Sequence, residues 1–342
     1  MLKVGIIGYG YWGTNLVRNF VESAHCQVHS VSDLSAQRLS IIGARYPTIK
    51  TTTDAGEVIR NPEVDAIVVA TPVASHFDLA LAALQAGKHV LVEKPITSTS
   101  AQAMQLIEEA AKRKLTLMVD HTFVYTSAVR KMRELVLNGE LGQPYYYDSV
   151  RVNLGLFQHD VNVLWDLAVH DLSILHYVLP GDPVAVTAAG MSHVTGGTEN
   201  IAYLTLFFKD NLIGHIHVNW LAPVKIRQTL IGGSRRMLIY DDTEGSEKVR
   251  VYDKGIQVTD TAPESLYQLR INYRTGDMWA PRIDNTEALK VEVQEFVDAI
   301  RGGRRPLTDG ESGLKVVRIL EAATQSMSKR GQVVELVRGA QA

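Results

Sequence analysis

The spacing of apolar residues along the chain changes near residue 122. Before that point, short runs of consecutive apolar residues alternate with stretches in which apolar residues recur every three or four positions. Such runs are typical of strands that are buried on both faces, and such stretches are typical of the helices that cover them. The runs read "LKVGIIG", "QVHSVSD", "AIVVATP", "HVLVEKP" and "LTLMVDH". For residues 1–121 we therefore predict an α/β domain with a doubly wound parallel sheet.

Beyond residue 122 the apolar residues alternate with polar ones over longer runs, such as "IAYLTLFFKD", "NLIGHIHVNWL", "IRQTLIGGSRRMLIY" and "EKVRVYD". Strict alternation is typical of antiparallel sheets with one covered face. A Lys-Asp-Asn turn between two of the runs indicates a hairpin. Helices are expected at "AVRKMRELVLNG" and "LWDLAVHDLSILHYVL", and two more close the chain. We predict that residues 122–342 form an α+β domain with a large, mostly antiparallel open sheet.

Composition narrows the class of protein. The 342 residues exceed one ordinary core, and 46% apolar with 21% charged residues is typical of soluble globular proteins. The formal net charge is -2 without a long run of one sign, and no apolar segment could span a bilayer, so we expect neither nucleic acid nor membrane as a partner. The start "MLKVGIIGYG" is interpreted as a strand, not a signal peptide. The single cysteine, Cys26, excludes a disulfide framework, and a cytoplasmic location is expected.

A glycine-rich loop follows the first predicted strand. The segment "GYGYWG" has the G-x-G-x-x-G spacing of dinucleotide-binding loops. Gly8 would permit the tight turn, Gly10 the approach of a pyrophosphate, and Gly13 the close packing of helix on strand. The free N–H groups and the dipole at the helix start favour a bound phosphate. The alternative is a glycine turn in an unrelated α/β protein.

Asp33 ends the second predicted strand. An acidic residue at this place accepts hydrogen bonds from the adenosine ribose hydroxyls and repels a 2′-phosphate, which predicts NAD as the cofactor rather than NADP. Arg38, in the following helix pattern, could soften this preference, so NADP stays possible. If the loop binds no nucleotide, Asp33 is simply a helix cap.

The fourth predicted strand ends on Glu93, Lys94 and Pro95. Ligands of open parallel sheets bind beyond the carboxyl ends of the strands, so polar residues are expected there. A partly desolvated lysine beside a cation has a lowered pKa, and Lys94 could therefore act as a general base near neutral pH. Pro95 fixes the turn, and the bond before it is a candidate for a cis peptide. A surface Lys-Glu pair at a strand end explains these residues equally well.

Four segments together resemble the glucose-fructose oxidoreductase, inositol dehydrogenase and MocA-like family. They are "GIIGYGYWG", "ATPVASHFDLALAALQAGKHVLVEKP", "WDLAVHD" and "PLTDGESGLKVVRILEAATQS", and they span nearly the whole chain in this order. The resemblance implies a Rossmann domain, residues 1–121, followed by a domain of residues 122–342 that binds substrate and forms a homodimer or homotetramer through its open sheet. It also implies NAD(P)-dependent oxidation or reduction of a sugar, cyclitol or nucleotide-sugar.

The resemblance also assigns roles to single residues. Lys94 matches the catalytic lysine of the family, and Asp166 and His170 match its Asp-x3-His pair on a helix of the second domain. Residues four apart share a helix face, so His170 could relay a proton while Asp166 binds a sugar hydroxyl or orients the histidine. Without the resemblance, a helix histidine with a core partner would be the better interpretation of His170.

Further matches complete the expected site. Val73 stands where the family often has an asparagine, so a ribose contact is expected to be lost, and Val124 stands where an arginine is frequent. The expected cofactor contacts are Gly8, Tyr9, Gly10, Tyr11, Trp12, Gly13, Asp33, Thr71, Pro72, His76, Glu93, Lys94 and Pro95. The expected substrate contacts are Lys94, His121, Tyr125, Asp166 and His170.

Other polar groups have ordinary structural interpretations. His215 and His217 share one face of a predicted strand, and they could bind a metal with the Asp-x3-His pair. Packing against a partner subunit is favoured, and no metal is expected. Arg151, Asn153 and Arg227 could hold substrate hydroxyls or a phosphate, or be surface charges. We expect structural roles for Asp171, His176, Trp220 and the three tyrosines 145–147.

The sequence thus predicts an NAD(H)-dependent oxidoreductase in which Lys94 takes the substrate's hydroxyl proton, assisted by His170 and Asp166. One alternative is an NAD-dependent enzyme that cleaves a glycosidic bond through an internal redox cycle and releases no NADH. Another is a non-catalytic nucleotide-binding sensor, which would have no need of a proton relay.

Overall fold

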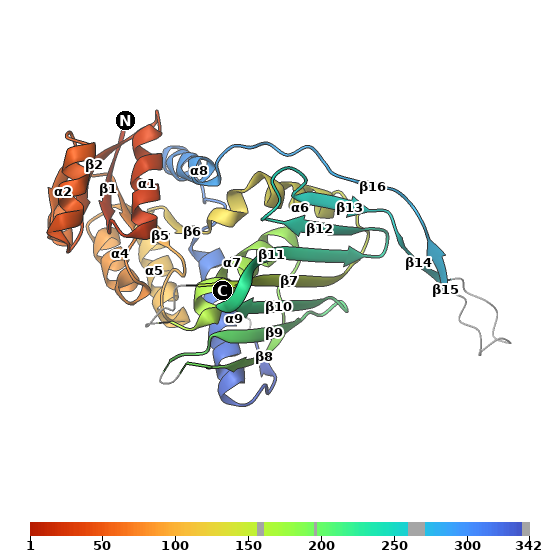
Figure 1. The fold of residues 1–342 in the computed structure, drawn as a ribbon. Coiled ribbons are helices and arrows are strands. Elements are labelled where there is room, and N and C mark those ends of the chain that lie inside the picture. Colours follow the sequence, from red (N-terminus) through yellow and green to blue (C-terminus); the bar gives the residue numbers. More distant parts are fainter. Residues whose placement is uncertain (156–160, 195–196, 259–270, 337–342) are drawn as a thin grey trace. The chain divides into compact units, whose positions relative to one another are not determined.

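The computed structural model describes residues 1–155, 161–194, 197–258 and 271–336 (Figure 1). Its contacts divide the chain into two compact units. The first comprises Met1–Thr126 with Thr286–Glu321, and the second comprises Ser127–Asn285 with Ala322–Ala342. By its contacts, the segment 286–321 therefore groups with the N-terminal unit, whereas the sequence pattern placed it together with the rest of residues 122–342.

Six parallel strands form the sheet of the first unit, in the order β3-β2-β1-β4-β5-β6. The chain builds outward from β1 to β3, then returns and builds outward from β4 to β6. The strand order thus reverses between β1 and β4, which confirms the predicted doubly wound sheet. The strands are β1 (Leu2–Ile7), β2 (Cys26–Ser32), β3 (Lys50–Thr52), β4 (Ala66–Val69), β5 (His89–Glu93) and β6 (Leu117–Asp120).

Each connection between consecutive strands carries a helix, as parallel pairing requires. The helices are α1 (Tyr11–Glu22), α2 (Ala36–Arg45), α3 (Ala55–Arg60), α4 (His76–Gln85) and α5 (Ser100–Arg113), with short 3₁₀ turns η1 (Val73–Ser75) and η2 (Thr122–Tyr125). Helix α8 (Ala288–Gly302) packs on α1. The rings of Phe20 and Phe296 meet edge to face at 6.4 Å between centroids, and Arg18 pairs with Glu287 at 2.5 Å. These contacts fix the segment 286–321 to the first unit.

Strands β4 and β5 form the centre of the first core. All four residues of β4 are buried, and Val90, Leu91 and Val92 of β5 have no exposed surface. Burying an apolar side chain of this size contributes about 1.5–3 kcal/mol, so uninterrupted apolar runs occur where both faces of the sheet are covered. Polar residues begin where these runs end, at Thr71 beyond β4 and at Glu93 on β5.

The second unit contains a sheet of nine strands, in the order β16-β13-β12-β11-β7-β10-β9-β8-β17. Among the described strands of this sheet, β7 and β10 pair in parallel and the other neighbours pair antiparallel, which confirms the predicted α+β character. The strands are β7 (Pro144–Leu154), β8 (Ala185–Met191), β9 (Ile201–Phe207), β10 (Ile213–Asn219), β11 (Leu221–Gly233), β12 (Met237–Asp241), β13 (Val249–Tyr252), β16 (Met278–Trp279) and β17 (Val334–Glu335). A separate pair consists of β14 (Gly255–Val258) and β15 (Ile271–Arg274).

Two turns show how local sequence shapes this sheet. Strands β9 and β10 form the predicted hairpin, and Asn211 in its turn has φ +56°, a left-handed conformation that asparagine tolerates. The run "IRQTLIGGSRRMLIY" is not one strand but two, because it folds back between β11 and β12. The N–H of Gly233 donates to the Arg236 carbonyl at 2.9 Å across that turn.

The helices of the second unit are α6 (Ser127–Leu137), a π-helical turn η3 (Leu164–Ala168), α7 (Val169–Val178) and the last part of α9 (Gly310–Ser328). Helix α6 packs against β12, and α7 packs against β7. Along β9 and β10, buried residues alternate with the partly exposed Tyr203 and Ile213, so one face of the sheet is left open. In the part of the chain that the structure describes, every helix is too short or too polar to cross a membrane.

Candidate active site

The glycine loop joins β1 to α1 with the geometry that its spacing predicts. Gly8 has φ +100°, and a Cβ at this position would lie 2.3 Å from the Ala70 carbonyl oxygen. A Cβ on Gly13 would lie 2.3 Å from the Gly8 carbonyl oxygen, so this glycine permits the close approach of helix and strand. The Cβ position of Gly10 faces open space, where a ligand can approach the backbone.

Helix α1 begins after Gly10 without a side-chain cap and without an acidic residue in its first turn. The first N–H groups of a helix have no intrahelical acceptor, and with the helix dipole they attract anions. Tyr11 points away from the core, with 87% of its surface exposed, while Tyr9 is buried. The start of α1 thus offers backbone donors that suit the pyrophosphate of a dinucleotide.

Asp33 follows β2 and is tied to the glycine loop. Its Oδ2 accepts a hydrogen bond from the Tyr9 N–H at 2.7 Å, and its Oδ1 accepts one from the Ser35 N–H at 2.8 Å. The Arg38 guanidinium lies 3.4 Å from Oδ2, and its side chain is 54% exposed. The carboxylate is therefore fixed at the carboxyl end of β2, with an exposed cation beside it.

Thr71, Pro72 and His76 lie between β4 and the first turn of α4. The His76 ring is buried, with Nδ1 2.9 Å from the Pro95 carbonyl oxygen and Nε2 2.7 Å from the Thr71 carbonyl oxygen. Strands β4 and β5 are neighbours in the sheet. His76 thus connects the loop beyond β4 to the turn beyond β5, and it acts on the site by holding these two segments together.

Lys94 directly follows the last residue of β5, and both it and Glu93 are half-buried. The peptide bond between Lys94 and Pro95 is cis. In the register of β5 on β6, Glu93 lies beside Asp120. Asp120 is buried, and its Oδ2 accepts a hydrogen bond from Trp12 Nε1 at 2.6 Å. The glycine loop therefore meets the ends of β5 and β6 at the carboxyl ends of the strands.

His121 and Tyr125 follow β6, and each is 2% exposed. The Thr308 hydroxyl donates to the Val119 carbonyl at 2.7 Å, so the Tyr125 hydroxyl, 2.9 Å away, donates to Thr308 Oγ1. Burial raises the pKa of Tyr125 well above its usual range, which keeps the phenol protonated. Tyr125 is thus anchored in the core of the first unit by its own hydroxyl.

Asp166 and His170 belong to the second unit. Asp166 lies in the π-helical turn η3 and His170 in the first turn of α7, so the two residues flank a junction of helix types. Trp220 was expected to serve packing alone, but its Nε1 also donates to Asp166 Oδ2 at 3.0 Å. The sequence pattern indicated neither this bond nor the π turn, and π turns occur frequently at functional sites.

The structure corrects the interpretation of Arg151, which is neither a surface charge nor exposed to a ligand. Its Nε donates to Asp171 Oδ2 at 2.7 Å, and both side chains are at most 3% exposed. The Ser149 hydroxyl donates to the same carboxylate at 2.6 Å. Asp171 has the structural role that we predicted. Arg227 pairs at 3.2 Å with Asp242, which directly follows the neighbouring strand β12.

The two histidines of β10 form an aromatic row with Tyr203 of β9. The rings of Tyr203 and His217 stack at 4.4 Å between centroids, and His215 lies 6.3 Å from Tyr203. Burial, and then the neighbouring His215, lower the pKa of His217. Among the residues that the structure describes, no three His, Cys, Asp or Glu side chains gather closely enough to hold a metal ion.

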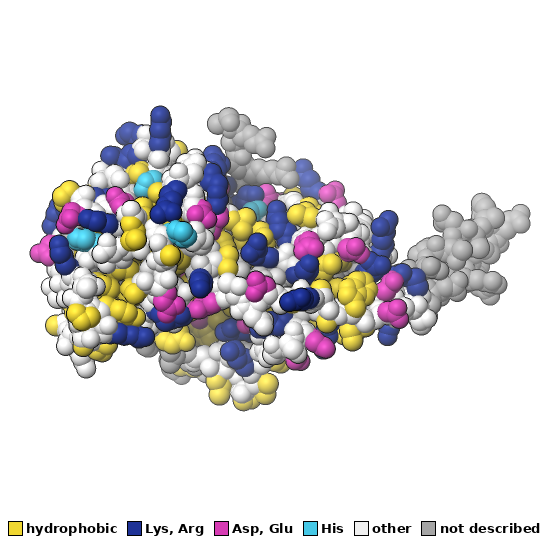
Figure 2. All heavy atoms as spheres, turned by 90° about the horizontal axis from the view of Figure 1, so that it is seen from above, with side chains coloured by type: hydrophobic (Ala, Val, Ile, Leu, Met, Phe, Trp, Pro, Cys, Tyr) yellow, Lys and Arg dark blue, Asp and Glu magenta, His cyan; other side chains and the backbone are white. Residues whose placement is uncertain are grey.

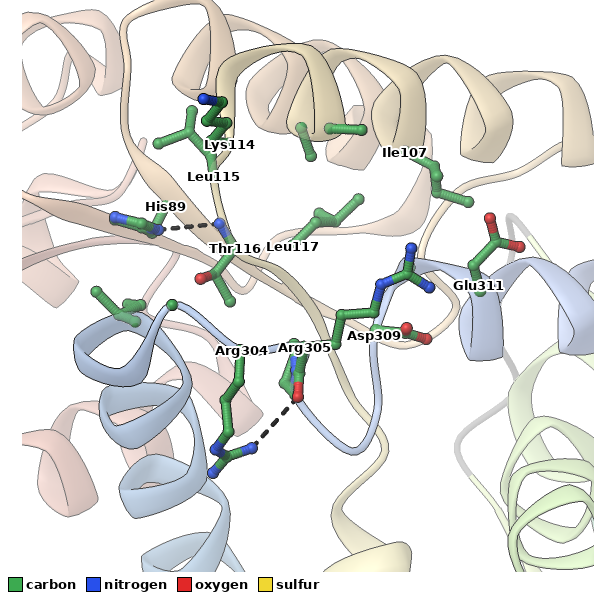
Figure 3. A pocket seen from close by; sticks show the side chains of 16 residues that line it. His89, Ile107, Lys114, Leu115, Thr116, Leu117, Arg304, Arg305, Asp309 and Glu311 are labelled. Carbon is green, nitrogen blue, oxygen red and sulfur yellow. Dashed lines mark hydrogen bonds between the residues drawn. The ribbon is translucent and has the colours of Figure 1, made fainter.

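A cavity of about 300 Å³ lies at the other edge of the first sheet, at the amino ends of β5 and β6 (Figure 3). His89 Nδ1 accepts a hydrogen bond from the Thr116 N–H at 2.9 Å, and Leu115 and Leu117 add apolar surface. The predicted cofactor and substrate residues do not line this cavity. The cavity is therefore separate from the carboxyl ends of the strands, where Lys94 lies.

Charged side chains of both signs are interspersed on the face shown in Figure 2. Lysine and arginine side chains do not gather there into a continuous stripe or patch. Proteins that bind nucleic acid carry such a basic footprint, so this face gives no support to a nucleic-acid partner.

Sequence reasoning missed two residues of the candidate site. Asp120 stands at the end of β6, where its place after a buried apolar run could have identified it. Glu292 lies on α8, is fully buried and interacts with Asp120. The pattern of "ALKVEVQEFVDAI" predicts a helix. It does not show that this helix packs against the N-terminal domain, from which more than 160 residues separate it in the sequence.

Two family models match the chain: residues 2–121 match an oxidoreductase family with an NAD-binding Rossmann fold, and residues 129–239 match the GFO/IDH/MocA C-terminal domain. The chain is 25% identical to a myo-inositol 2-dehydrogenase of Thermotoga maritima, over 97% of this chain and 98% of the relative. It is 26% identical to a UDP-N-acetylglucosamine 3-dehydrogenase of Acidithiobacillus ferrooxidans, over 95% and 96%. The structure of GenD2 from gentamicin A biosynthesis in complex with NAD has the same fold, with a TM-score of 0.82 at 24% identity over 98% of this chain and 97% of that one.

Proposed function

The chain belongs to the GFO/IDH/MocA family of oxidoreductases with an NAD-binding Rossmann domain, and we propose that it transfers a hydride between nicotinamide and a hydroxyl-bearing carbon of a sugar, nucleotide-sugar or cyclitol. The relatives named above act on a cyclitol and on a nucleotide-sugar. These two substrate classes share adjacent secondary hydroxyl groups, which is the chemical feature that a common site would recognise.

The observation that carries the proposal is the position of Lys94. It stands beyond the carboxyl end of β5, on the edge of the sheet where Trp12 of the glycine loop bonds Asp120. Ligands of doubly wound sheets bind beyond this edge, near the reversal of strand order. An amine in this place lies within the same unit as the cofactor loop, where it can exchange a proton with a group on the reacting carbon.

The residues of the first unit fit NAD. The donors at the start of α1 would hold the pyrophosphate, and Asp33 would accept hydrogen bonds from the adenosine ribose. Leu34, 94% exposed, offers apolar surface beside Asp33 for the adenine ring. The segments at Thr71–Pro72 and Glu93–Pro95 would border the nicotinamide half, and His76 holds these two segments together. When bound, NAD supplies the hydride acceptor.

Lys94 would take the proton of the substrate hydroxyl during oxidation and return it during reduction, which is general acid–base catalysis. Asp166 and His170 of the second unit would bind substrate hydroxyls, and His170 would accept or relay the proton. The bond from Trp220 orients the Asp166 carboxylate. His121 and Tyr125 would support the substrate pocket from behind, since both side chains are buried.

We also propose that the cofactor is NAD rather than NADP. A 2′-phosphate would meet the Asp33 carboxylate, whose position is fixed by two backbone N–H groups. Arg38 lies on the exposed side of this carboxylate and is already engaged with it. Its charge is therefore partly neutralised, so it gives a 2′-phosphate little compensation for the repulsion from Asp33.

The open face of the nine-stranded sheet is the proposed contact between subunits of a homodimer or homotetramer. Met191, Tyr203 and Ile213 are between 43% and 67% exposed on this face, although they are large and apolar. Apolar side chains on a neighbouring set of strands form a surface that a second copy can cover. Sedimentation at several concentrations tests this proposal.

The experiment that tests the catalytic proposal incubates the protein with NAD⁺ and a panel of sugars, inositols and nucleotide-linked sugars. The near-ultraviolet absorbance of NADH and the loss of substrate by mass spectrometry are followed together, for wild type and for Lys94→Ala. We expect Lys94→Ala to lower turnover by about 10²- to 10⁴-fold with NAD⁺ affinity kept. Near-normal turnover of this variant would overturn the role of Lys94.

The same panel separates the competing hypotheses. Formation of NADH in step with substrate loss supports the dehydrogenase. Substrate loss without NADH points to an internal redox cycle, in which the reduced cofactor returns its hydride before release. Binding of NAD⁺ with no turnover of any member of the panel contradicts the proposed substrate class.

A further inference from the structure

Glu292 of α8 is a buried acid that the proposed reaction does not yet use. Its exposed fraction is 0%, and neither of its carboxyl oxygens has a hydrogen-bond donor among the described residues. The group that interacts with it most strongly is another carboxyl, that of Asp120 at the end of β6. Asp120 is 1% exposed. Helix α8 packs against η2, which begins two residues after Asp120, so these two acidic side chains meet in the interior of the first unit.

Two side-chain donors next to the pair, from Trp12 and Thr122, bond Asp120. Trp12 Nε1 donates to its Oδ2 at 2.6 Å, and the Thr122 hydroxyl donates to its Oδ1. The Thr122 hydroxyl carries one hydrogen, which is used in this bond, although its oxygen also lies close to Glu292. Asp120 is thus satisfied as a carboxylate, and Glu292 is not.

The charged and titratable groups that face the pair come from several elements. Glu93 of β5 repels Glu292, and the Lys94 amine attracts Asp120. Tyr125 of η2 also faces Glu292, and its phenol is protonated and bonded to Thr308. Glu295, one turn along α8, is paired with Arg304. Within this set, Lys94 is therefore the cation that acts on Asp120.

Two carboxylates without a donor between them repel each other strongly in a buried site, and such pairs retain one proton at neutral pH. One proton on Glu292 turns the contact into an O–H···O hydrogen bond, in which Glu292 donates and Asp120 accepts. Burial and the adjacent Asp120 raise the pKa of Glu292 well above its usual range, which agrees with this count of protons.

We propose that Asp120 and Glu292 hold one proton between them, and that the single negative charge of the pair sets the protonation of the Lys94 amine during turnover. The part that concerns Lys94 rests on the proposed function, whereas the shared proton does not. Glu292 acts through Asp120 and is a positioning residue. Trp12 of the glycine loop donates a hydrogen bond to the same Asp120 carboxylate. This bond fixes the position of the negative charge near Lys94 relative to the glycine loop.

The pH profile of turnover tests the charge of the pair. Asp120→Asn removes the negative charge near Lys94, so the midpoint of the pH profile should move to lower pH by about one pH unit or more. Glu292→Gln replaces a protonated acid by a neutral amide that can still donate to Asp120, so the midpoint of its profile should stay at the wild-type value. Asp298→Asn, an exposed change on the same helix, is the matched control.

Two outcomes of this comparison overturn the proposal. If Glu292→Gln lowers the midpoint as much as Asp120→Asn does, both carboxyls are ionised in the wild type. If Asp120→Asn leaves the midpoint where it was, the pair does not set the charge of Lys94. A shift in Asp120→Asn alone supports the proposal.

The pH dependence of the thermal stability tests the shared proton independently of turnover. The unfolded chain releases the Glu292 proton near pH 4.5, while the folded protein keeps it. Folding therefore takes up a proton above that pH, and wild-type stability falls as the pH rises through this window. Glutamine cannot titrate, so the Tm of Glu292→Gln should gain on the wild type between about pH 5 and about pH 8.

A constant Tm difference across this range, measured for Glu292→Gln and compared with Asp298→Asn, overturns the shared proton. This result decides the matter even if Asp120→Asn does not fold. The two measurements also separate the two proposals. Full turnover of Lys94→Ala would contradict the catalytic role of Lys94, whereas the shared proton would still be decided by the Tm of Glu292→Gln.

Discussion

His76 Nδ1 lies 2.9 Å from the carbonyl oxygen of Pro95, the residue that follows the proposed catalytic lysine. On its other side the same ring meets the Thr71 carbonyl, in the loop beyond the neighbouring strand. A buried ring that places one nitrogen beside a carbonyl of each loop restricts both loops. The geometry of Lys94 thus depends on a buried histidine that is also predicted to be among the cofactor contacts.

We expect His76→Phe to lower both stability and turnover. Phenylalanine keeps a ring of similar size but leaves the carbonyl that accepts the ring N–H without this donor, and a buried polar group left unpaired costs about 1–3 kcal/mol. Thermal denaturation and steady-state kinetics measure the two effects, and kcat should fall more than NAD⁺ affinity. His76→Asn, which keeps one donor, should be intermediate. Unchanged kcat in His76→Phe would show that the turn holds its shape alone.

Asp33→Ser should relax the preference for NAD⁺ over NADP⁺. A pair of charges at 4 Å is worth about 1–4 kcal/mol between water and a protein surface, so the ratio of the two kcat/KM values should fall by about tenfold or more. Adding Arg38→Ala to Asp33→Ser should restore part of the ratio, because it removes the cation available to a 2′-phosphate. Asp54→Asn, another loop acid of this unit, is the control. An unaltered ratio would contradict the role of Asp33.

Trp220→Phe should weaken substrate binding through Asp166. The indole N–H donates to this carboxylate at 3.0 Å, and a hydrogen bond to a charged group contributes about 1.5–3 kcal/mol. KM for the substrate should therefore rise by about tenfold or more, with NAD⁺ affinity unchanged. Trp165→Phe removes a similar bond, from Nε1 to Thr324, in the same helical turn and serves as the control. Equal KM values in the two variants would argue against a substrate contact by Asp166.

The location of the site at the carboxyl ends of the strands could be predicted, because the chain changes from buried to partly exposed and from apolar to charged at the same residues. Val92 has no exposed surface, whereas Glu93 and Lys94 are half-buried. An apolar run that ends abruptly on charged residues marks the point where a parallel strand leaves the core. The same reasoning would have identified Asp120 at the end of "LMVD".

Arg151 and Glu292 could not be placed in this way. Alternation along a strand separates two faces but does not say which face is covered, and Arg151 lies on the covered one. Its partner Asp171 stands on a helix 20 residues away, so the ion pair exists only in the folded unit. The contact of Glu292 with Asp120 depends on α8 docking against the first unit, where Phe296 meets Phe20. Such docking depends on complementary surfaces, which a single sequence does not display.

The aromatic row on the open sheet face should make stability sensitive to acid. Burial and the neighbouring His215 lower the pKa of His217, so the unfolded chain binds a proton at a higher pH than the folded protein does. The stability that this histidine contributes is then present above the ordinary pKa of about 6.5, and it is lost as the pH falls through that value. His217→Gln should therefore lose less Tm than the wild type between about pH 7.5 and about pH 5. His25→Gln, at an exposed position, should follow the wild type, and parallel curves for all three proteins would refute the effect. Sedimentation over the same range shows whether subunits separate as His217 is protonated, as expected if a second copy covers this face.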